Sequence, residues 1–351
     1  MGEEKANTER MLFGDSPPPG LVGIARLASQ SPTLEAKRAV EYFELPTRSL
    51  LNRTRPGLPF TWTVNPYRGC EFACKYCYAR YTHEFMGEEP ESFENRIYAK
   101  ANLPQILRRE LRGTAESEGI AIGTATDPYQ PAERRFERTR SILEVLARER
   151  GRSISITTKS DLVVRDLDLL RQIQQHNSIH VNVTVTTLNA KLARLLEPRA
   201  PRPDLRLSAV RRLADAGIPV GVFPNPILPL ITDGEQSLDR LAKAAKDHGA
   251  SYFGGGILFL MPAAQKVFFP FLKAQFPHLL RRYEERYRAG AYLKGSYPET
   301  IKARIYAIRE RYGLAGGPTK ESVTGAEHLQ PGLFDGMEVE CERGGPPVSI
   351  Q

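Results

Sequence analysis

The segment that decides the fold is residues 65–78, NPYRGCEFACKYCY, in which three cysteines follow a short β-rich run. Cys70, Cys74 and Cys77 are spaced Cys-x3-Cys-x2-Cys, with a tyrosine on each side of the third cysteine. Three thiolates this close together can bind three irons of one cubic iron–sulfur cluster, which leaves the fourth iron without a protein ligand. Because an open coordination position is where a metal centre does chemistry, the spacing predicts a 4Fe–4S cluster with a reactive iron.

Zinc binding is the main alternative use of these cysteines. A zinc ion would need a fourth ligand, for which His83 and Cys341 are the candidates. Structural zinc sites usually combine two Cys-x2-Cys-like pairs, and the sequence has no second pair. A disulfide framework is disfavoured, because the chain is long and its charged N-terminus does not read as a signal peptide. The cluster is therefore the preferred interpretation.

Composition places few limits on function. A chain of 351 residues can bury a large core without disulfides. The net charge of +8 favours polyanionic partners such as nucleic acid, although solvated helix faces explain much of the charge equally well. No run of 18 apolar residues predicts a membrane span, and reduced thiols suit the cytoplasm, where we expect the protein.

Short β-rich runs alternate with amphipathic helices between residues 61 and 260. The predicted strands are 61–64, 120–124, 154–158, 179–187, 218–223 and 252–260, and the predicted helices are 101–112, 138–148, 162–173, 205–216 and 238–248. Six β-then-α units predict an α/β fold of parallel strands joined by right-handed crossovers. The pattern alone does not distinguish a barrel from an open sheet.

The flanking segments suggest four parts of the chain. We expect a flexible polar leader over residues 1–35 and a catalytic core over 36–260, whose first residues wrap the main domain. A helical extension is expected over 261–313, followed by a Gly/Pro-rich disordered tail over 314–351.

The cysteine spacing, with an aromatic residue before the third cysteine, resembles the radical S-adenosylmethionine (SAM) superfamily. The run CKYCY at 74–78, followed by TATD at 124–127 and TKS at 158–160, resembles its spore photoproduct lyase branch over roughly residues 58–260. The resemblance implies a partial six-unit (β/α) barrel, open on one side. It also implies that SAM binds the open iron and that one electron cleaves it to methionine and a 5′-deoxyadenosyl radical. That radical takes hydrogen from a substrate, and the electron comes from a donor of the flavodoxin or ferredoxin type.

The same resemblance assigns residues to SAM. Lys159 closes a predicted buried strand, where a SAM carboxylate would compensate its charge, unless the lysine turns out to solvent. Thr126 and Asp127 offer acceptors to the SAM ammonium group, although Asp127-Pro128 also favours a turn.

Four further residues complete the predicted site. Ser160 and Thr186 are expected near the ribose or carboxylate of SAM. Tyr76 is expected along the adenine, and Tyr78 on the substrate side, where the lyase branch implicates both tyrosines in passing the radical. Simple packing of the cysteine loop is the alternative for the two tyrosines.

Three more features bear on the chemistry. Spore photoproduct lyases have a hydrogen-donating cysteine where this chain has Thr124, whose O–H bond is much stronger than a thiol S–H bond. Dimer reversal by that route is therefore not expected. Glu197 and Arg206 are expected to form a structural ion pair, and the glycines at 254–256 to let backbone approach a ligand.

The substrate is where the sequence says least. Nucleic acid is the leading candidate, and a protein or small molecule stays open. A non-catalytic zinc- or cluster-containing nucleic-acid-binding protein is the alternative function. Gln330–Phe334, QPGLF, resembles peptides that bind the bacterial sliding clamp, although Pro331 stands where leucine is usual and docking back onto the barrel is an alternative.

Overall fold

The computed structural model describes residues 23–315 except positions 32, 38–39 and 56. Its main sheet has the strand order β11-β10-β9-β8-β7-β4-β3. Six of these strands run parallel, and β3 (Leu51–Arg53) pairs antiparallel at one edge. The parallel strands are β4 (Trp62–Val64), β7 (Ile120–Ile122), β8 (Ser153–Thr158), β9 (Ser178–Thr184), β10 (Val220–Phe223) and β11 (Tyr252–Phe253). The predicted α/β fold with six parallel units is confirmed.

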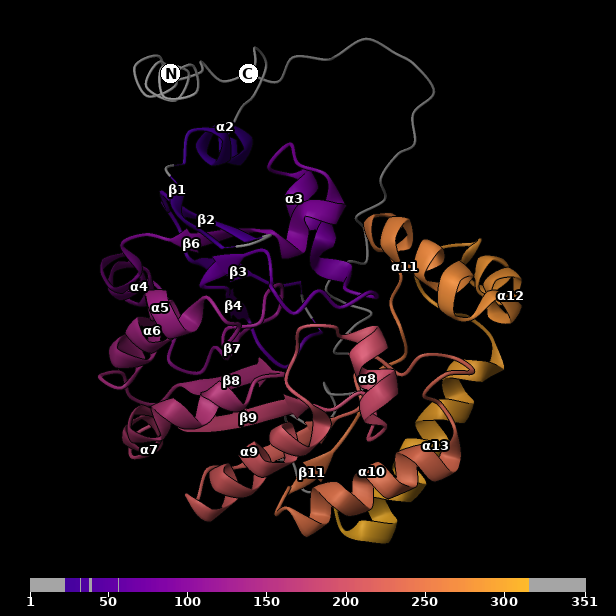
Figure 1. Ribbon diagram of the computed structural model, residues 1–351. Helices are drawn as coiled ribbons and strands as arrows, with labels where there is room; N and C mark the ends of the chain where they lie inside the picture. Colours follow the sequence, from indigo (N-terminus) through magenta and orange to yellow (C-terminus); the bar gives the residue numbers. More distant parts are fainter. Residues whose placement is uncertain (1–22, 32, 38–39, 56, 316–351) are drawn as a thin grey trace, which may run out of the picture.

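Helices cover the outer face of this sheet (Figure 1). They include α4 (Leu103–Leu111), α6 (Arg138–Leu146), α7 (Leu167–Gln174), α9 (Pro203–Asp215) and α10 (Glu235–Asp247). Two more helices lie elsewhere: α5 (Glu133–Phe136) packs Phe136 beside Tyr42, and α8 (Ala190–Leu196) packs Leu196 with the cysteine loop. The apolar side chains at helical spacing in α4 are buried against the core, as the pattern predicts: Leu103, Ile106, Leu107 and Leu111. The helix expected over 162–173 is split, because a 3-10 segment, η3 (Asp161–Asp166), precedes α7.

A second sheet of order β1-β2-β6-β5 packs beside the barrel. Its strands are β1 (Thr33–Lys37), β2 (Val40–Leu45), β6 (Arg96–Lys100) and β5 (Tyr67–Arg68), and β5 leads directly into the cysteine loop. Part of the expected flexible leader is structured, because α2 (Gly23–Ser29) and β1 lie within residues 23–37. Ala28 of α2 is buried against Phe43 and Leu45 of β2, which gives this segment an apolar contact.

Helices α11 (Pro262–Gln275), α12 (Pro277–Tyr287) and α13 (Ser296–Tyr312) follow the last strand and flank the open side of the sheet (Figure 1). The sixth strand is shorter than expected, since β11 ends at Phe253 before the three glycines. Shorter elements near the cysteines are η1 (Tyr78–Arg80), α3 (Tyr81–Glu84) and η2 (Pro90–Glu94). No described helix is both long and apolar enough to cross a membrane. Cys341 and Gln330–Phe334 lie outside the described residues.

Candidate active site

The cysteine loop is held in place by a fully buried arginine. Arg80 donates from Nη1 to the carbonyl of Pro90 at 2.9 Å and from Nη2 to the carbonyl of Cys74 at 3.1 Å. Its charge is compensated by Glu94, with which it forms an ion pair. A buried guanidinium with carbonyl and carboxylate acceptors fixes the loop more firmly than apolar packing alone would. The loop geometry thus depends on a residue that the cysteine motif does not include.

Polar side chains from the β7 end hold the start of the same loop. Gln130 donates to the carbonyl of Gly69 at 3.1 Å and accepts from the backbone N–H of Glu71 at 2.9 Å. Thr126 donates its hydroxyl to the Gly69 carbonyl at 2.6 Å. Gly69 has a φ of +80°, and a Cβ there would lie 2.6 Å from the carbonyl oxygen of Arg96. Only glycine fits this close approach, so β5 can turn directly into the cysteines.

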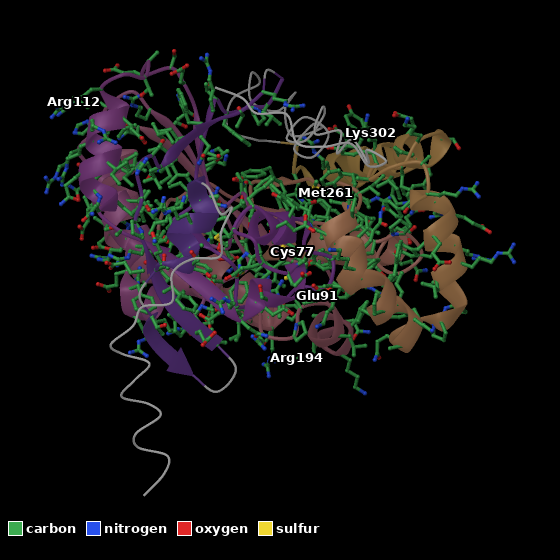
Figure 2. All side chains as sticks on the ribbon, turned by 90° about the horizontal axis from the view of Figure 1, so that it is seen from above. Cys77, Glu91, Arg112, Arg194, Met261 and Lys302 are labelled. Atoms are coloured by element: carbon green, nitrogen blue, oxygen red, sulfur yellow. The ribbon has the colours of Figure 1, made fainter. Side chains whose placement is uncertain are left out.

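A cavity of about 250 Å³ lies at the carboxyl ends of the parallel strands and extends into the barrel lumen. All three clustered cysteines line it, together with the loops that follow β7, β8 and β10. Seen from above, Cys77 lies well inside the molecule, between the labelled Glu91 and Met261 (Figure 2). This is the end of a parallel barrel where active sites occur.

The three cysteines line the cavity together, as the ligands of one metal centre must. Cys70 and Cys74 are each 8% exposed, and burial raises the pKa of the Cys74 thiol to about 12. Within the described residues, no three His, Cys, Asp or Glu side chains are grouped closely enough to hold a single ion. In a cubic iron–sulfur cluster each thiolate would bind a different iron.

His83, a candidate zinc ligand by sequence, has a structural role. It is fully buried and edge-on to the rings of Phe93 and Tyr98. Burial lowers its pKa to about 4, so the ring is neutral and its Nε2 donates to the carbonyl of Arg96 at 3.0 Å. It does not line the cavity beside the cysteines.

Tyr76 joins a buried polar cluster behind the cysteine loop. Its hydroxyl donates to Glu197 and lies 3.2 Å from that of Thr186. Thr186 also donates to Glu197 at 2.6 Å, and Arg206 Nη2 lies 2.5 Å from the other carboxylate oxygen. The predicted Glu197–Arg206 pair is therefore present, with both side chains at most 1% exposed. What the sequence missed is that this pair fixes Tyr76, because Glu197 is distant along the chain.

Lys159 lies between the buried polar side chains around Glu197 and the cavity. Its ammonium nitrogen is 5.8 Å from the centroid of the Tyr76 ring, and the residue lines the cavity. Among the described residues, the ammonium forms no salt bridge. Burial alone would lower its pKa, but the nearby Cys74 and Glu197 outweigh burial and raise the pKa above the usual value. A cationic side chain thus borders the cavity without a dedicated counter-ion.

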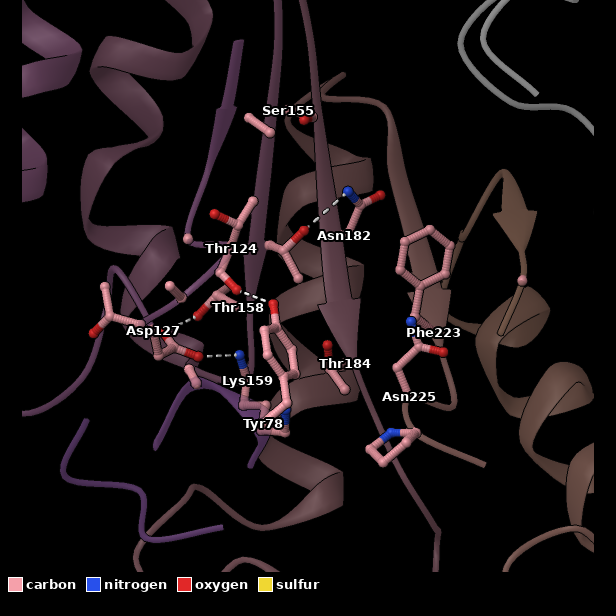
Figure 3. Close-up of a pocket in the computed structure, with 18 of the residues that line it drawn as sticks. Tyr78, Thr124, Asp127, Ser155, Thr158, Lys159, Asn182, Thr184, Phe223 and Asn225 are labelled. Carbon is pink, nitrogen blue, oxygen red and sulfur yellow. Dashed lines mark hydrogen bonds between the residues drawn. The ribbon is translucent and has the colours of Figure 1, made fainter. Parts of the chain in front are cut away.

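Asp127 holds the end of β8 rather than pairing with the Lys159 side chain. Its carboxylate accepts from the Thr158 hydroxyl at 2.6 Å and from the Lys159 backbone N–H at 2.7 Å (Figure 3). It also accepts from the Tyr129 backbone N–H at 3.0 Å. Burial raises the pKa of Asp127, and these hydrogen bonds limit the increase. Ser160 is buried too, and its hydroxyl caps η3 by accepting from Leu162.

Tyr78 and Thr124 meet at the wall of the cavity. The Tyr78 hydroxyl donates to the backbone carbonyl of Thr124 (Figure 3). The Thr124 hydroxyl accepts from the Asn65 amide at 3.1 Å. Both residues line the cavity. Tyr78 and Thr124, like Lys159 and the cysteines, are therefore brought together as the motif order along the strands predicts.

The fold and this arrangement of cysteines define a class of proteins. The family model of the radical SAM superfamily matches residues 64–247, more than half of the chain. The chain belongs to the radical SAM superfamily and is a radical SAM enzyme.

Individual relatives place it more narrowly. An uncharacterized protein of Mycobacterium tuberculosis is 36% identical over 314 residues, which cover 87% of this chain and 90% of that protein. An uncharacterized protein of Methanocaldococcus jannaschii is 32% identical over 198 residues, covering 56% and 71%. The structure of spore photoproduct lyase complexed with dinucleoside spore photoproduct aligns with a TM-score of 0.60 at 17% identity, over 84% of each chain. The fold is thus that of spore photoproduct lyase.

Proposed function

We propose that Cys70, Cys74 and Cys77 hold one site-differentiated 4Fe–4S cluster, and that SAM binds its open iron and is cleaved reductively. The observation that carries this proposal is that the three cysteines and Lys159 open into one cavity at the strand ends. When bound, the reduced cluster supplies an electron that splits SAM into methionine and a 5′-deoxyadenosyl radical, which removes hydrogen from the substrate.

The chain's own residues then have separate tasks. Lys159 binds the SAM carboxylate, because its ammonium borders the cavity without a counter-ion among the described residues. Tyr76, held by Glu197, presents its ring to the adenine. Asp127 positions Lys159 because its carboxylate accepts a hydrogen bond from the Lys159 backbone N–H. Leu258 and Phe259 add apolar wall that keeps water from the radical.

In this proposal, three residues that the sequence predicts to contact SAM mainly hold neighbouring protein groups in place. Thr126 donates to the Gly69 carbonyl, Ser160 caps η3, and Thr186 donates to Glu197. Each hydroxyl already has a protein partner, so it supports the residues around SAM. A hydrogen bond to SAM itself would use the donor or acceptor site that the protein partner leaves free.

We further propose nucleic acid as the substrate. The net charge of +8 supports a polyanionic partner, and the solved spore photoproduct lyase has a dinucleoside lesion bound. Thr124 cannot donate a hydrogen atom as a thiol would. Anaerobic incubation with dinucleotide spore photoproduct, SAM and reductant should therefore give no catalytic thymine recovery, and efficient turnover would contradict this point.

Cysteine substitutions test the central proposal. Anaerobically purified wild-type protein should be brown, contain iron and sulfide, and release 5′-deoxyadenosine from SAM with dithionite or reduced flavodoxin. Cys74→Ala should lose the cluster and at least 100-fold of this activity, whereas the matched control Cys341→Ala should keep both. Cys74→Ala protein that retained iron and SAM cleavage would refute the proposed ligand set. Colourless wild-type protein that carried zinc would favour the non-catalytic alternative.

A further inference from the structure

Polar side chains line the lumen of the barrel, at positions that apolar side chains normally fill in such barrels. In the strand register, Ala121, Ser155 and His180 form one row across β7, β8 and β9. Thr157, Asn182, Gly221 and Tyr252 form the next row across β8 to β11. Closed parallel barrels usually fill these layers with branched aliphatic side chains. Here small and polar residues leave part of the 250 Å³ cavity open between them.

Several of these polar groups have no protein partner. Nδ1 of His180 is buried and has no hydrogen-bond partner among the described residues, and the half-buried Ser155 lines the cavity beside it. The Thr157 hydroxyl accepts from the Asn182 amide at 3.3 Å, and no described acceptor takes its proton. Figure 3 shows Ser155, Asn182 and Thr184 following one another along the lumen toward Tyr78. Polar groups that line a cavity without protein partners are free to pair with a molecule that enters it.

The position of Asn182 is fixed from the opposite side. The Tyr252 hydroxyl donates to its Oδ1 at 2.6 Å, which turns the amide NH2 group toward Thr157. The Tyr252 ring reaches the lumen only because position 221 is glycine, since a Cβ there would overlap the ring. Phe223 packs against Tyr252 with ring centroids 5.9 Å apart. One wall of the lumen is therefore aromatic, and the other offers donors and acceptors in a fixed arrangement.

The two lumen rows carry no charged side chain. Neither row contains a carboxylate, lysine or arginine, and the guanidinium of Arg309 from α13 lines a different part of the same cavity. Burial lowers the pKa of His180 to about 4, so at neutral pH the ring is neutral and offers one donor and one acceptor. An aromatic wall facing neutral hydrogen-bonding groups suits a planar, uncharged heterocycle, which can pack against one of the two tilted rings of Tyr252 and Phe223.

We propose that His180, Thr157 and Asn182 are specificity-determining residues that bind the edge of one nucleobase-like ring of the substrate inside the barrel lumen. This inference rests on the proposed function, because it places the substrate ring in the same cavity as the cluster and SAM. The ring can come from a free nucleoside or from a base turned out of a nucleic acid strand.

Equilibrium dialysis tests the inference on the reconstituted holoenzyme, with the cluster kept oxidised and SAM present. The probes are thymidine, cytidine, adenosine and guanosine, and single-stranded octanucleotides of each base. We expect at least one base to bind wild-type protein. Thr157→Val, which keeps shape and strand propensity, should weaken its binding at least threefold, and His180→Phe at least tenfold. Binding of nucleosides and octanucleotides alike indicates free bases, and binding of octanucleotides alone indicates a strand.

The matched control is His176→Phe, because His176 is a surface histidine paired with Arg150 and does not line the cavity. It should bind like wild type. The inference is overturned if no probe binds wild-type protein, or if Thr157→Val and His180→Phe, with normal cluster content, bind as wild type does. SAM cleavage is measured on aliquots of the same samples after anaerobic reduction with dithionite. Cleavage without probe binding refutes this inference alone, whereas absence of cleavage refutes the proposed function.

Discussion

Two fully buried glutamates in this protein have similar partners and different surroundings. Glu133 accepts from the Tyr67 hydroxyl at 2.5 Å and from the backbone N–H of Thr139 at 2.8 Å, and it pairs with Arg165 at 2.7 Å. Glu197 likewise binds a tyrosine hydroxyl, a threonine and an arginine. Both glutamates are at most 1% exposed.

The two groups of side chains, around Glu133 and around Glu197, differ in whether they border the cavity. None of Glu133, Tyr67 and Arg165 lines it, and the Glu133 cluster joins the N-terminal sheet to helices on the outside of the barrel. Tyr76 in the Glu197 cluster lines the cavity, and Lys159 lies beside it. A buried, charge-paired carboxylate is therefore not by itself a sign of catalysis. Its position relative to the reactive centre decides whether it positions functional groups or only stabilises the fold.

The largest expected effect on stability is at Glu133. Glu133→Ala removes the acceptor of the Tyr67 hydroxyl and of two backbone N–H groups and leaves Asp166 as the nearest remaining carboxylate to Arg165, so the free energy of unfolding should fall by about 3–5 kcal/mol. SAM cleavage per intact cluster should stay as in wild type. Urea denaturation and 5′-deoxyadenosine release measure the two quantities. The control Glu144→Ala removes an exposed carboxylate 4.0 Å from Arg140 and should change stability little. A drop in SAM cleavage per iron–sulfur cluster in Glu133→Ala would show that the groups of side chains around Glu133 and around Glu197 are not functionally separate.

Glu197→Gln should affect both stability and function. Burial alone would raise the pKa of Glu197, but Arg206 and Lys159 outweigh burial and hold it below the usual value of 4.5. A depressed pKa contributes stability above pH about 4.5 and loses it as the pH falls through the folded-state pKa. Glu197→Gln should therefore be less stable at neutral pH and show a weaker loss of stability on acidification.

The same variant should also cleave SAM more slowly per iron–sulfur cluster, because Tyr76 loses the carboxylate that fixes its hydroxyl and Lys159 loses a nearby negative charge. Acid titrations of unfolding and 5′-deoxyadenosine release follow the two effects. Wild-type cleavage per cluster in Glu197→Gln would make the two glutamates equivalent and would refute the comparison.

Lys159→Met tests whether the cation beside the Glu197 cluster binds the cofactor. If its ammonium pairs with the SAM carboxylate, the dissociation constant of SAM should rise about 100-fold, equivalent to about 3 kcal/mol, with iron content unchanged. Equilibrium dialysis with labelled SAM is the measurement. Lys243→Met, which removes a surface lysine paired with Asp247, serves as the control. An unchanged SAM affinity in Lys159→Met would mean that the cation only balances the buried carboxylates.

The smallest expected effect comes from a matched pair of tyrosine variants. Tyr67→Phe and Tyr76→Phe each remove one hydroxyl donor from a buried glutamate, so each should lower the free energy of unfolding by about 1–2 kcal/mol. Only Tyr76→Phe should also change SAM affinity. Of the two tyrosines only Tyr76 lines the cavity, and its hydroxyl bond to Glu197 fixes the ring there. Equal SAM affinities in the two variants would show that the Tyr76 hydroxyl has a purely structural role.

Much of the fold can be predicted from the sequence, because its elements have local signals. The cysteine spacing indicates the superfamily, and the apolar periodicity of α4, α9 and α10 gives the helices close to their observed ends. The order of motifs along the strands also indicates which loops meet, because carboxyl ends of parallel strands lie at one edge. The direction of the Asp127 carboxylate was missed, since a turn and a ligand contact have the same sequence signal.

The sequence by itself determined the cluster loop, the six units and the class of enzyme, because spacing within a loop and periodicity within an element are local properties. Only the tertiary structure decided which distant side chains share a space. Glu197 meets Tyr76, Gln130 holds Gly69, and Tyr252 crosses Gly221 to reach Asn182. These contacts depend on strand register and on how loops from different units fold over one another. Both are fixed by packing between segments far apart in the chain, which no local pattern records.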